Sequence, residues 1–146
     1  MVLNTATIGD IDEKLSEYNS RMINSRLRAS RIAKRIVRKA LEEVGEEVFT
    51  GYQVRGLAYL LGFYDPSFDD MSSCAPGITY NTFRRKIKPH IPQEAIVPNK
   101  YPKRNNREYN ILFKRTGVEQ TFQKLATMGE LDYTPERFQY AVSKLP

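Results

Sequence analysis

The stretch ITYNTFRRKIKPH, residues 78–90, predicts a short, well-defined helix. The Thr79 hydroxyl is suited to cap its first turn, because it can accept a hydrogen bond from a backbone N–H there. Ile78 and Phe83 have the spacing of a hydrophobic staple. Pro89 is expected to end the helix after about three turns, since proline has no N–H to donate and disfavours a helical residue before it.

Apolar and basic residues occupy opposite sides of this predicted helix. Phe83 and Ile87 form its inner stripe. The outer face carries Tyr80, Asn81, Arg84, Arg85 and Lys88. A rigid helix with arginines and an asparagine on one face suits the reading of base edges in the DNA major groove. The alternative interpretation is a solvated basic face on an ordinary core helix.

A hairpin is predicted directly after this helix. Glu94–Val97 is expected to form a short strand, and the alternating apolar residues of Arg107–Phe113 predict a second one. The segment between them, Pro98–Asn106, is basic and rich in turn-forming residues. The cations of this segment, together with Arg107 directly after it, are expected to lie along phosphates or to enter a minor groove. They are Lys100, Lys103, Arg104 and Arg107.

Another helix is predicted before it, over residues 50–62. Val54, Leu57, Ala58 and Leu61 give it an apolar stripe, and Gly62 is typical of a helix C-terminus. Residues 63–77 are rich in Pro, Ser, Asp and Gly, which indicates a loop.

The N-terminal stretch from Asp10 to Val48 has helical periodicity. Asp10 and Glu13 have the spacing of a capping box that opens it. Asn24 and the nearby serines interrupt the pattern, so one long helix and two shorter helices are both compatible with it. Gly45 is a weak point near its end.

The charge of this stretch is asymmetric. Eight basic residues and no acidic one lie between positions 21 and 39: Arg21, Arg26, Arg28, Arg31, Lys34, Arg35, Arg38 and Lys39. Arg28, Arg31 and Arg35 fall opposite the apolar stripe. Such a block of like charge favours an anionic partner, and these three arginines are candidate DNA contacts. The alternative is a solvated face balanced by acidic residues elsewhere.

Two further helices are predicted near the C-terminus. Thr116 and Glu119 have the spacing of a capping box that opens a helix through about Met128, and Gly129 is expected to end it. Thr134, Pro135 and Glu136 are typical of another helix start: a cap, a proline in the first turn and a carboxylate near the positive end of the dipole.

Composition limits the classes of function. With 146 residues and a net charge of +6, the chain can bury a core and favours a polyanionic partner. It has no apolar run long enough for a membrane span and no signal-peptide pattern at its start. A single cysteine, Cys74, and a single histidine, His90, argue against disulfides and a cysteine–histidine metal site. We therefore expect a cytoplasmic protein without metal or cofactor.

No catalytic motif is recognisable. A nucleophile needs a base beside it, and His90 lies at the end of a basic helix. Asp65, Asp69 and Asp70 form a loose acidic cluster in the loop, but loop aspartates commonly form turns, and their spacing matches no specific magnesium motif. We expect that the protein is not an enzyme.

The pair LAYLLGF (57–63) and ITYNTFRRKIKPH (78–90) resembles the two helices of bacterial helix-turn-helix regulators. With the basic hairpin, the stretch 50–113 is similar to winged helix-turn-helix repressors, including the mercury-resistance-regulator (MerR) family. Two features depart from that family. About fifteen residues separate Gly62 from Ile78, where the family turn has three or four, and some fifty residues precede the motif. The resemblance implies docking roles for the second helix and the hairpin only.

These observations predict a mainly α winged helix-turn-helix fold with a long N-terminal helix, C-terminal helices and a small two-stranded β wing. The expected segments are an N-terminal helical extension for dimerisation or DNA contact (1–49), the DNA-binding domain (50–115) and a C-terminal helical pair (116–146). The expected function is a sequence-specific double-stranded DNA-binding transcriptional regulator, a repressor acting as a homodimer, with no membrane partner. The alternative is a non-enzymatic interaction or scaffold protein whose basic helix at 26–44 binds RNA, an anionic membrane or an acidic protein partner.

Overall fold

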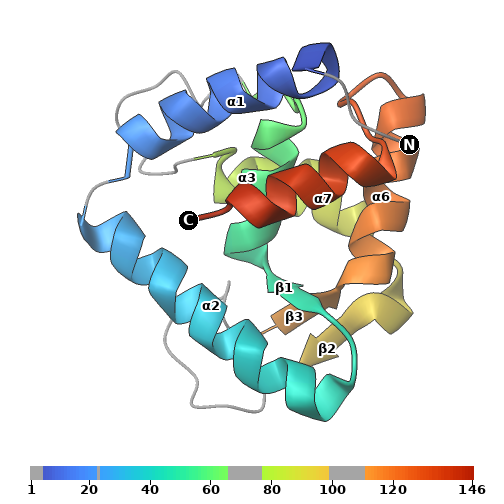
Figure 1. The fold of residues 1–146 in the computed structure, drawn as a ribbon. Helices are drawn as coiled ribbons and strands as arrows, with labels where there is room; N and C mark the ends of the chain where they lie inside the picture. Colours follow the sequence, from blue (N-terminus) through green and yellow to red (C-terminus); the bar gives the residue numbers. More distant parts are fainter. Residues whose placement is uncertain (1–4, 23, 66–76, 99–110) are drawn as a thin grey trace.

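The computed structural model describes residues 5–22, 24–65, 77–98 and 111–146, which form a mainly helical fold with a small antiparallel sheet (Figure 1). The longer helices are α1 (Thr5–Ser20), α2 (Asn24–Val44), α3 (Gly51–Leu60), α6 (Arg115–Thr127) and α7 (Pro135–Lys144). The strands are β1 (Val48–Thr50), β2 (Ile96–Pro98) and β3 (Ile111–Lys114). Four short turns of helix precede β2: α4 (Tyr80–Thr82), the π-helical η2 (Phe83–Ile87), and the 3-10 helices η3 (Lys88–His90) and η4 (Gln93–Ala95). The mainly helical class is thus confirmed.

The N-terminal stretch forms two helices, α1 and α2, so the second of the two alternatives for it is correct. The predicted capping box at Asp10 is wrong, because α1 already begins at Thr5. The Asp10 carboxylate instead accepts two hydrogen bonds, of 3.0 and 2.9 Å, from the Arg137 guanidinium in α7. These bonds lower the pKa of Asp10 below its ordinary value. They tie the first helix to the last one.

The sheet has three strands in the order β1-β3-β2, whereas two were predicted. The third strand, β1, includes Val48, which the periodicity placed in the helix. Its residue Phe49 lies opposite Phe113 of the central strand β3. Side chains alternate along a strand, so Val48 and Leu112 pack against Ala40 of α2, while Phe49 and Phe113 belong to the main core. Helix α2 therefore covers one face of the sheet and the remaining core covers the other.

Helix α3 lies at the centre of the molecule, and all of its residues except Gln53 are buried. Its start is a capping box, in which the Thr50 hydroxyl accepts from the Gln53 N–H and the Gln53 side chain accepts from the Thr50 N–H. The predicted stop at Gly62 is confirmed. Gly62 has a φ of 101°, and the Phe63 N–H donates to the Ala58 carbonyl, as in a Schellman motif.

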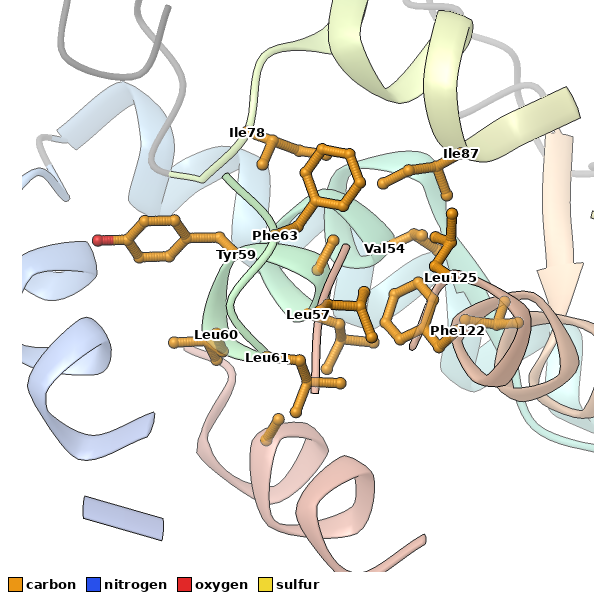
Figure 2. Packing of buried hydrophobic residues seen from close by; sticks show 14 of the residues in the cluster. Val54, Leu57, Tyr59, Leu60, Leu61, Phe63, Ile78, Ile87, Phe122 and Leu125 are labelled. Atoms are coloured by element: carbon orange, nitrogen blue, oxygen red, sulfur yellow. The ribbon is translucent and has the colours of Figure 1, made fainter. Parts of the chain in front are cut away.

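One apolar cluster draws residues from all three predicted segments, from Ile11 to Ala141. Figure 2 shows α3 between its neighbours, with Ile78 and Ile87 approaching it from one side and Phe122 of α6 from another. Because α3 is covered on all sides, its position fixes that of the segments packed on it.

The bounds of the two hairpin strands differ from the prediction where the structure describes them. The strand expected from Glu94 begins at Ile96, because residues 93–95 form a 3-10 turn closed by a hydrogen bond from the Ala95 N–H to the Pro92 carbonyl. The strand expected over Arg107–Phe113 is described from Ile111 onward. Strands β2 and β3 are antiparallel neighbours, with Val97 opposite Leu112.

The two C-terminal helices differ in how well their starts were predicted. The capping box at Thr116 is wrong: α6 begins at Arg115 without a side-chain cap, and Glu119 accepts a hydrogen bond of 3.0 Å from the Arg115 side chain. The start of α7 is confirmed, since the Thr134 hydroxyl accepts from the Arg137 N–H and Pro135 is the first helical residue.

Candidate nucleic-acid interface

The residues 80–90 form one continuous helical segment, α4–η2–η3, which we call the 80–90 helix. Its predicted cap is confirmed, because the Thr79 hydroxyl accepts a hydrogen bond from the Thr82 N–H at 3.2 Å. A second contact was not anticipated. The buried carboxylate of Asp65 accepts from the Thr79 N–H at 2.9 Å and from its hydroxyl at 3.1 Å. Asp65 therefore holds the first turn of this helix.

Helix α3 fixes the same turn from the other side. The buried Arg55 donates from its Nε to the Ile78 carbonyl at 2.8 Å. Gly77 packs directly on the α3 backbone: a Cβ there would lie 3.0 Å from the Arg55 carbonyl oxygen and 3.2 Å from the Gly56 Cα. Arg55 was missed in the sequence because an arginine in a helix ordinarily indicates an exposed face. The sequence Gly77-Ile78-Thr79 was the available signal that another element packs closely on the start of this helix.

The inner side of the 80–90 helix is anchored as predicted. Phe83 and Ile87 are 2% and 0% exposed, and Ile78 is fully buried with them. The Phe83 ring meets the edge of Phe113 in β3, with centroids 5.7 Å apart. The 80–90 helix thus packs on α3 and on the core face of the sheet.

The helix is not a regular α-helix, which corrects the prediction of three α-helical turns ended by Pro89. In η2 the Lys88 N–H donates to the Phe83 carbonyl, which is a π-type hydrogen bond. Pro89 then lies inside the 3-10 turn η3, and the helix ends at His90. Proline is tolerated there because a residue in the first turn needs no N–H partner. Short π segments inside helices occur frequently at functional sites.

The predicted outer face is solvent-accessible. Asn81, Arg84 and Arg85 are exposed, and Tyr80 and Lys88 are half-buried. The Arg84 guanidinium donates to the Asn81 side-chain oxygen at 3.2 Å. Lys86 is also exposed, although the helical wheel did not place it with the others. The 80–90 helix therefore presents consecutive exposed cations at 84–86 above an apolar base.

The remaining cations of the predicted interface fall into two groups. Lys100, Lys103, Arg104 and Arg107 lie outside the described residues, as do Cys74, Asp69 and Asp70. Arg28, Arg31 and Arg35 are exposed on α2, together with Lys34 and Arg38. We call these five residues the α2 basic face. None of the five has an ion pair or hydrogen bond with another side chain in the described part of the chain.

The two basic regions are separate surfaces. Ala40 of α2 packs on Val48 and Leu112, which project from one face of the sheet. Phe83 packs on Phe113, which projects from the other face. The structure therefore does not bring Arg28, Arg31 and Arg35 together with the outer face of the 80–90 helix.

Other types of site are not visible in the described residues. Within 5–22, 24–65, 77–98 and 111–146, no three histidine, cysteine, aspartate or glutamate side chains gather in a way that would hold a metal ion. Among the helices of these ranges, none has the length and apolar character needed to span a membrane.

Comparisons with protein-family models, with curated proteins and with solved structures found no match to this chain.

Proposed function

We propose that the protein is a sequence-specific double-stranded DNA-binding regulator that reads base edges with the 80–90 helix. The observation that carries this proposal is the exposed row Asn81, Arg84 and Arg85 on a helix whose inner side is locked by Phe83 and Ile87. The succession of α3, the 80–90 helix and the antiparallel strands β2 and β3 supports a winged helix-turn-helix arrangement.

The chemistry of the exposed row fits direct readout. An arginine can donate two hydrogen bonds to the O6 and N7 atoms of a guanine, and an asparagine can pair with the N6 and N7 atoms of an adenine. Lys86 and Lys88 suit phosphate contacts, which position a protein on the duplex without reading its sequence. The Arg84–Asn81 hydrogen bond would hold these two side chains in register with each other.

The support beneath the helix favours a reading role over a solvated face. Asp65 and Arg55 are both buried, and both hold the entry to the 80–90 helix. A helix fixed in this way loses little conformational freedom on binding, so more of the contact energy contributes to affinity. As a regulator, the protein would act as a homodimer that occludes a promoter, with the segment carrying Lys100 to Arg107 on the flanking backbone.

The experiment is selection of bound sequences from a random duplex pool, followed by binding assays on the selected site. Replacing Arg84 and Arg85 with alanine should weaken binding to that site by about 100-fold, because each bidentate base contact contributes roughly 1–3 kcal/mol. The matched control is replacement of Lys124 and Lys144, two exposed lysines on α6 and α7, which removes the same charge elsewhere. Equal binding by the arginine variant and the parent protein would refute the proposal.

The α2 basic face favours a second candidate function, as an interaction or scaffold protein that binds RNA, an anionic membrane or an acidic protein. Its five exposed cations have no described side-chain partner, and they lie on a regular helix. Such a face attracts polyanions without reading them. Co-sedimentation with anionic vesicles and duplex binding at matched ionic strength separate the two functions. Binding to vesicles but not to duplex would support this second candidate.

A further inference from the structure

A groove of about 440 Å³ lies between α2, β1 and the end of α7. Its apolar lining comes from Val37 and Leu41 of α2, Phe49 of β1, and Val142 and Leu145 at the C-terminal end. Figure 1 shows the C-terminal end of α7 on the side of the molecule that carries α2. No residue of the 80–90 helix lines the groove, so it is distinct from the proposed DNA-reading face.

Leu41 is the exposed apolar residue of this groove. It is 47% exposed, and only Tyr64 and Met128 are comparably exposed large apolar residues in the described part of the chain. Leu41 follows Lys34 and Arg38 at helical spacing, and these two cations also line the groove. A contiguous apolar surface rimmed by polar residues marks an interaction site, and Leu41 adjoins the apolar lining of the groove beside Lys34 and Arg38.

The charges around Leu41 would match those of a second, antiparallel copy of α2. Helix α2 carries only basic charges up to position 39, and acidic residues follow from position 42. Arg38 and Glu42 are both exposed, and neither has a partner among the described residues. If two copies of α2 lie antiparallel with a two-fold axis near residue 40, Arg38 of each copy faces Glu42 of the other. The same symmetry places each Leu41 close to the axis, facing the groove of the other copy.

We propose that this face of α2 is a two-fold interface with a second copy of the chain, in which Leu41 of each copy enters the groove of the other. The overlap involves only the C-terminal half of α2, so Arg28 and Arg31 stay outside the contact. The inference rests on the proposed function in one respect: a regulator that occludes a two-fold site needs such a pairing. The charge pattern itself is independent of DNA.

The test is the molar mass of the full chain in solution, measured by sedimentation velocity over a range of protein concentrations. The parent protein should form dimers. Leu41→Glu should raise the dimer dissociation constant at least about 30-fold, the effect typical of a central interface residue. Met128→Glu is the matched control, since Met128 is 54% exposed on another part of the surface. Circular dichroism checks that each variant is folded.

A charge exchange separates this interface from any other. Arg38→Glu should weaken the dimer by repulsion from Glu42 of the second copy, and adding Glu42→Arg should restore it. A parent protein that is monomeric throughout, a Leu41→Glu variant that dimerises like the parent, or a double variant no better than Arg38→Glu would each overturn the proposal. A parent dimer that binds no duplex would refute the proposed function and leave the interface standing.

Discussion

Helix α2 and the 80–90 helix both present exposed cations, but they are held in different ways. Helix α2 is a regular helix of 21 residues that rests on the sheet through small and half-buried side chains such as Ala40 and Ile36. The 80–90 helix is short and irregular, and it is fixed by the large side chain of Phe83 and by polar contacts from Asp65 and Arg55.

This difference separates two kinds of basic surface. The five cations of the α2 basic face are exposed, and no side chain elsewhere in the described part of the chain holds them in position. Those of the 80–90 helix are positioned by residues distant in the sequence, which is the support that an accurate binding site requires. The difference supports the proposal that the 80–90 helix supplies specificity, whereas the α2 basic face attracts anions without reading them.

The largest effect is expected from removing the anchor of the 80–90 helix. Phe83→Ala should lower the free energy of unfolding by about 4 kcal/mol, because the cavity left beside Phe113 is fully buried. Val37→Ala on the half-buried side of α2 should cost about 1 kcal/mol. Urea denaturation measures both. Similar losses for the two variants would contradict the distinction between the two helices.

A smaller effect is expected from the polar support. Asp65→Ala should lower the free energy of unfolding by about 2 kcal/mol, because it leaves the Thr79 N–H without its charged acceptor. It should also weaken duplex binding, since the helix must then be ordered on binding. Glu13→Ala, the loss of an exposed carboxylate on α1, is the control. If Asp65→Ala leaves both stability and duplex affinity unchanged, Asp65 does not support the 80–90 helix.

The smallest effect concerns the pair Asp10–Arg137, which lies outside both basic helices. The pKa of Asp10 is lowered below 3.8 by the Arg137 guanidinium. A carboxyl group whose pKa is lower in the folded state stabilises the fold at pH values above its unfolded-state pKa. This contribution is lost as the pH falls through the folded-state pKa. Because Asp10 is 42% exposed, the contribution should be at most about 1 kcal/mol.

The corresponding variant is Arg137→Gln. The stability difference between the parent protein and this variant should shrink as the pH is lowered below about 3.8. Duplex affinity at neutral pH should not change in Arg137→Gln, which makes this variant a reference for the weaker duplex binding expected of Asp65→Ala. Thermal unfolding followed across acidic pH measures the first quantity. A difference that grows on acidification would refute the assigned sign.

The features that depend on local sequence were predicted best. The Thr79 and Thr134 caps and the Gly62 stop involve residues within a few positions of one another. The inner stripe of Phe83 and Ile87 follows from their spacing alone. These patterns were therefore sufficient to locate the 80–90 helix and its exposed face.

The features that depend on distant residues were not predicted. Strand β1 is only three residues long, and its pairing partner β3 lies some sixty residues further along the chain, so no local pattern distinguished it from the helix before it. Asp10 and Thr116 had the spacing of caps, but both lie inside helices that begin earlier, at Thr5 and Arg115, and the Asp10 carboxylate instead accepts from the Arg137 guanidinium. The role of Asp65 depends on Thr79, fourteen positions away.

Asp65 and Gly77 hold the two ends of the connection between α3 and the 80–90 helix, and this affects how the length of that connection can be changed. Both ends of the stretch 66–76 are secured independently of its length, by the Asp65 carboxylate on one side and by the seat of Gly77 on α3 on the other. Doubling the length of a connection adds only about 0.6 kcal/mol of closure entropy. An insertion between these two residues should therefore cost little closure entropy, while Asp65 and Gly77 keep the start of the 80–90 helix, and with it the arginine row, in place.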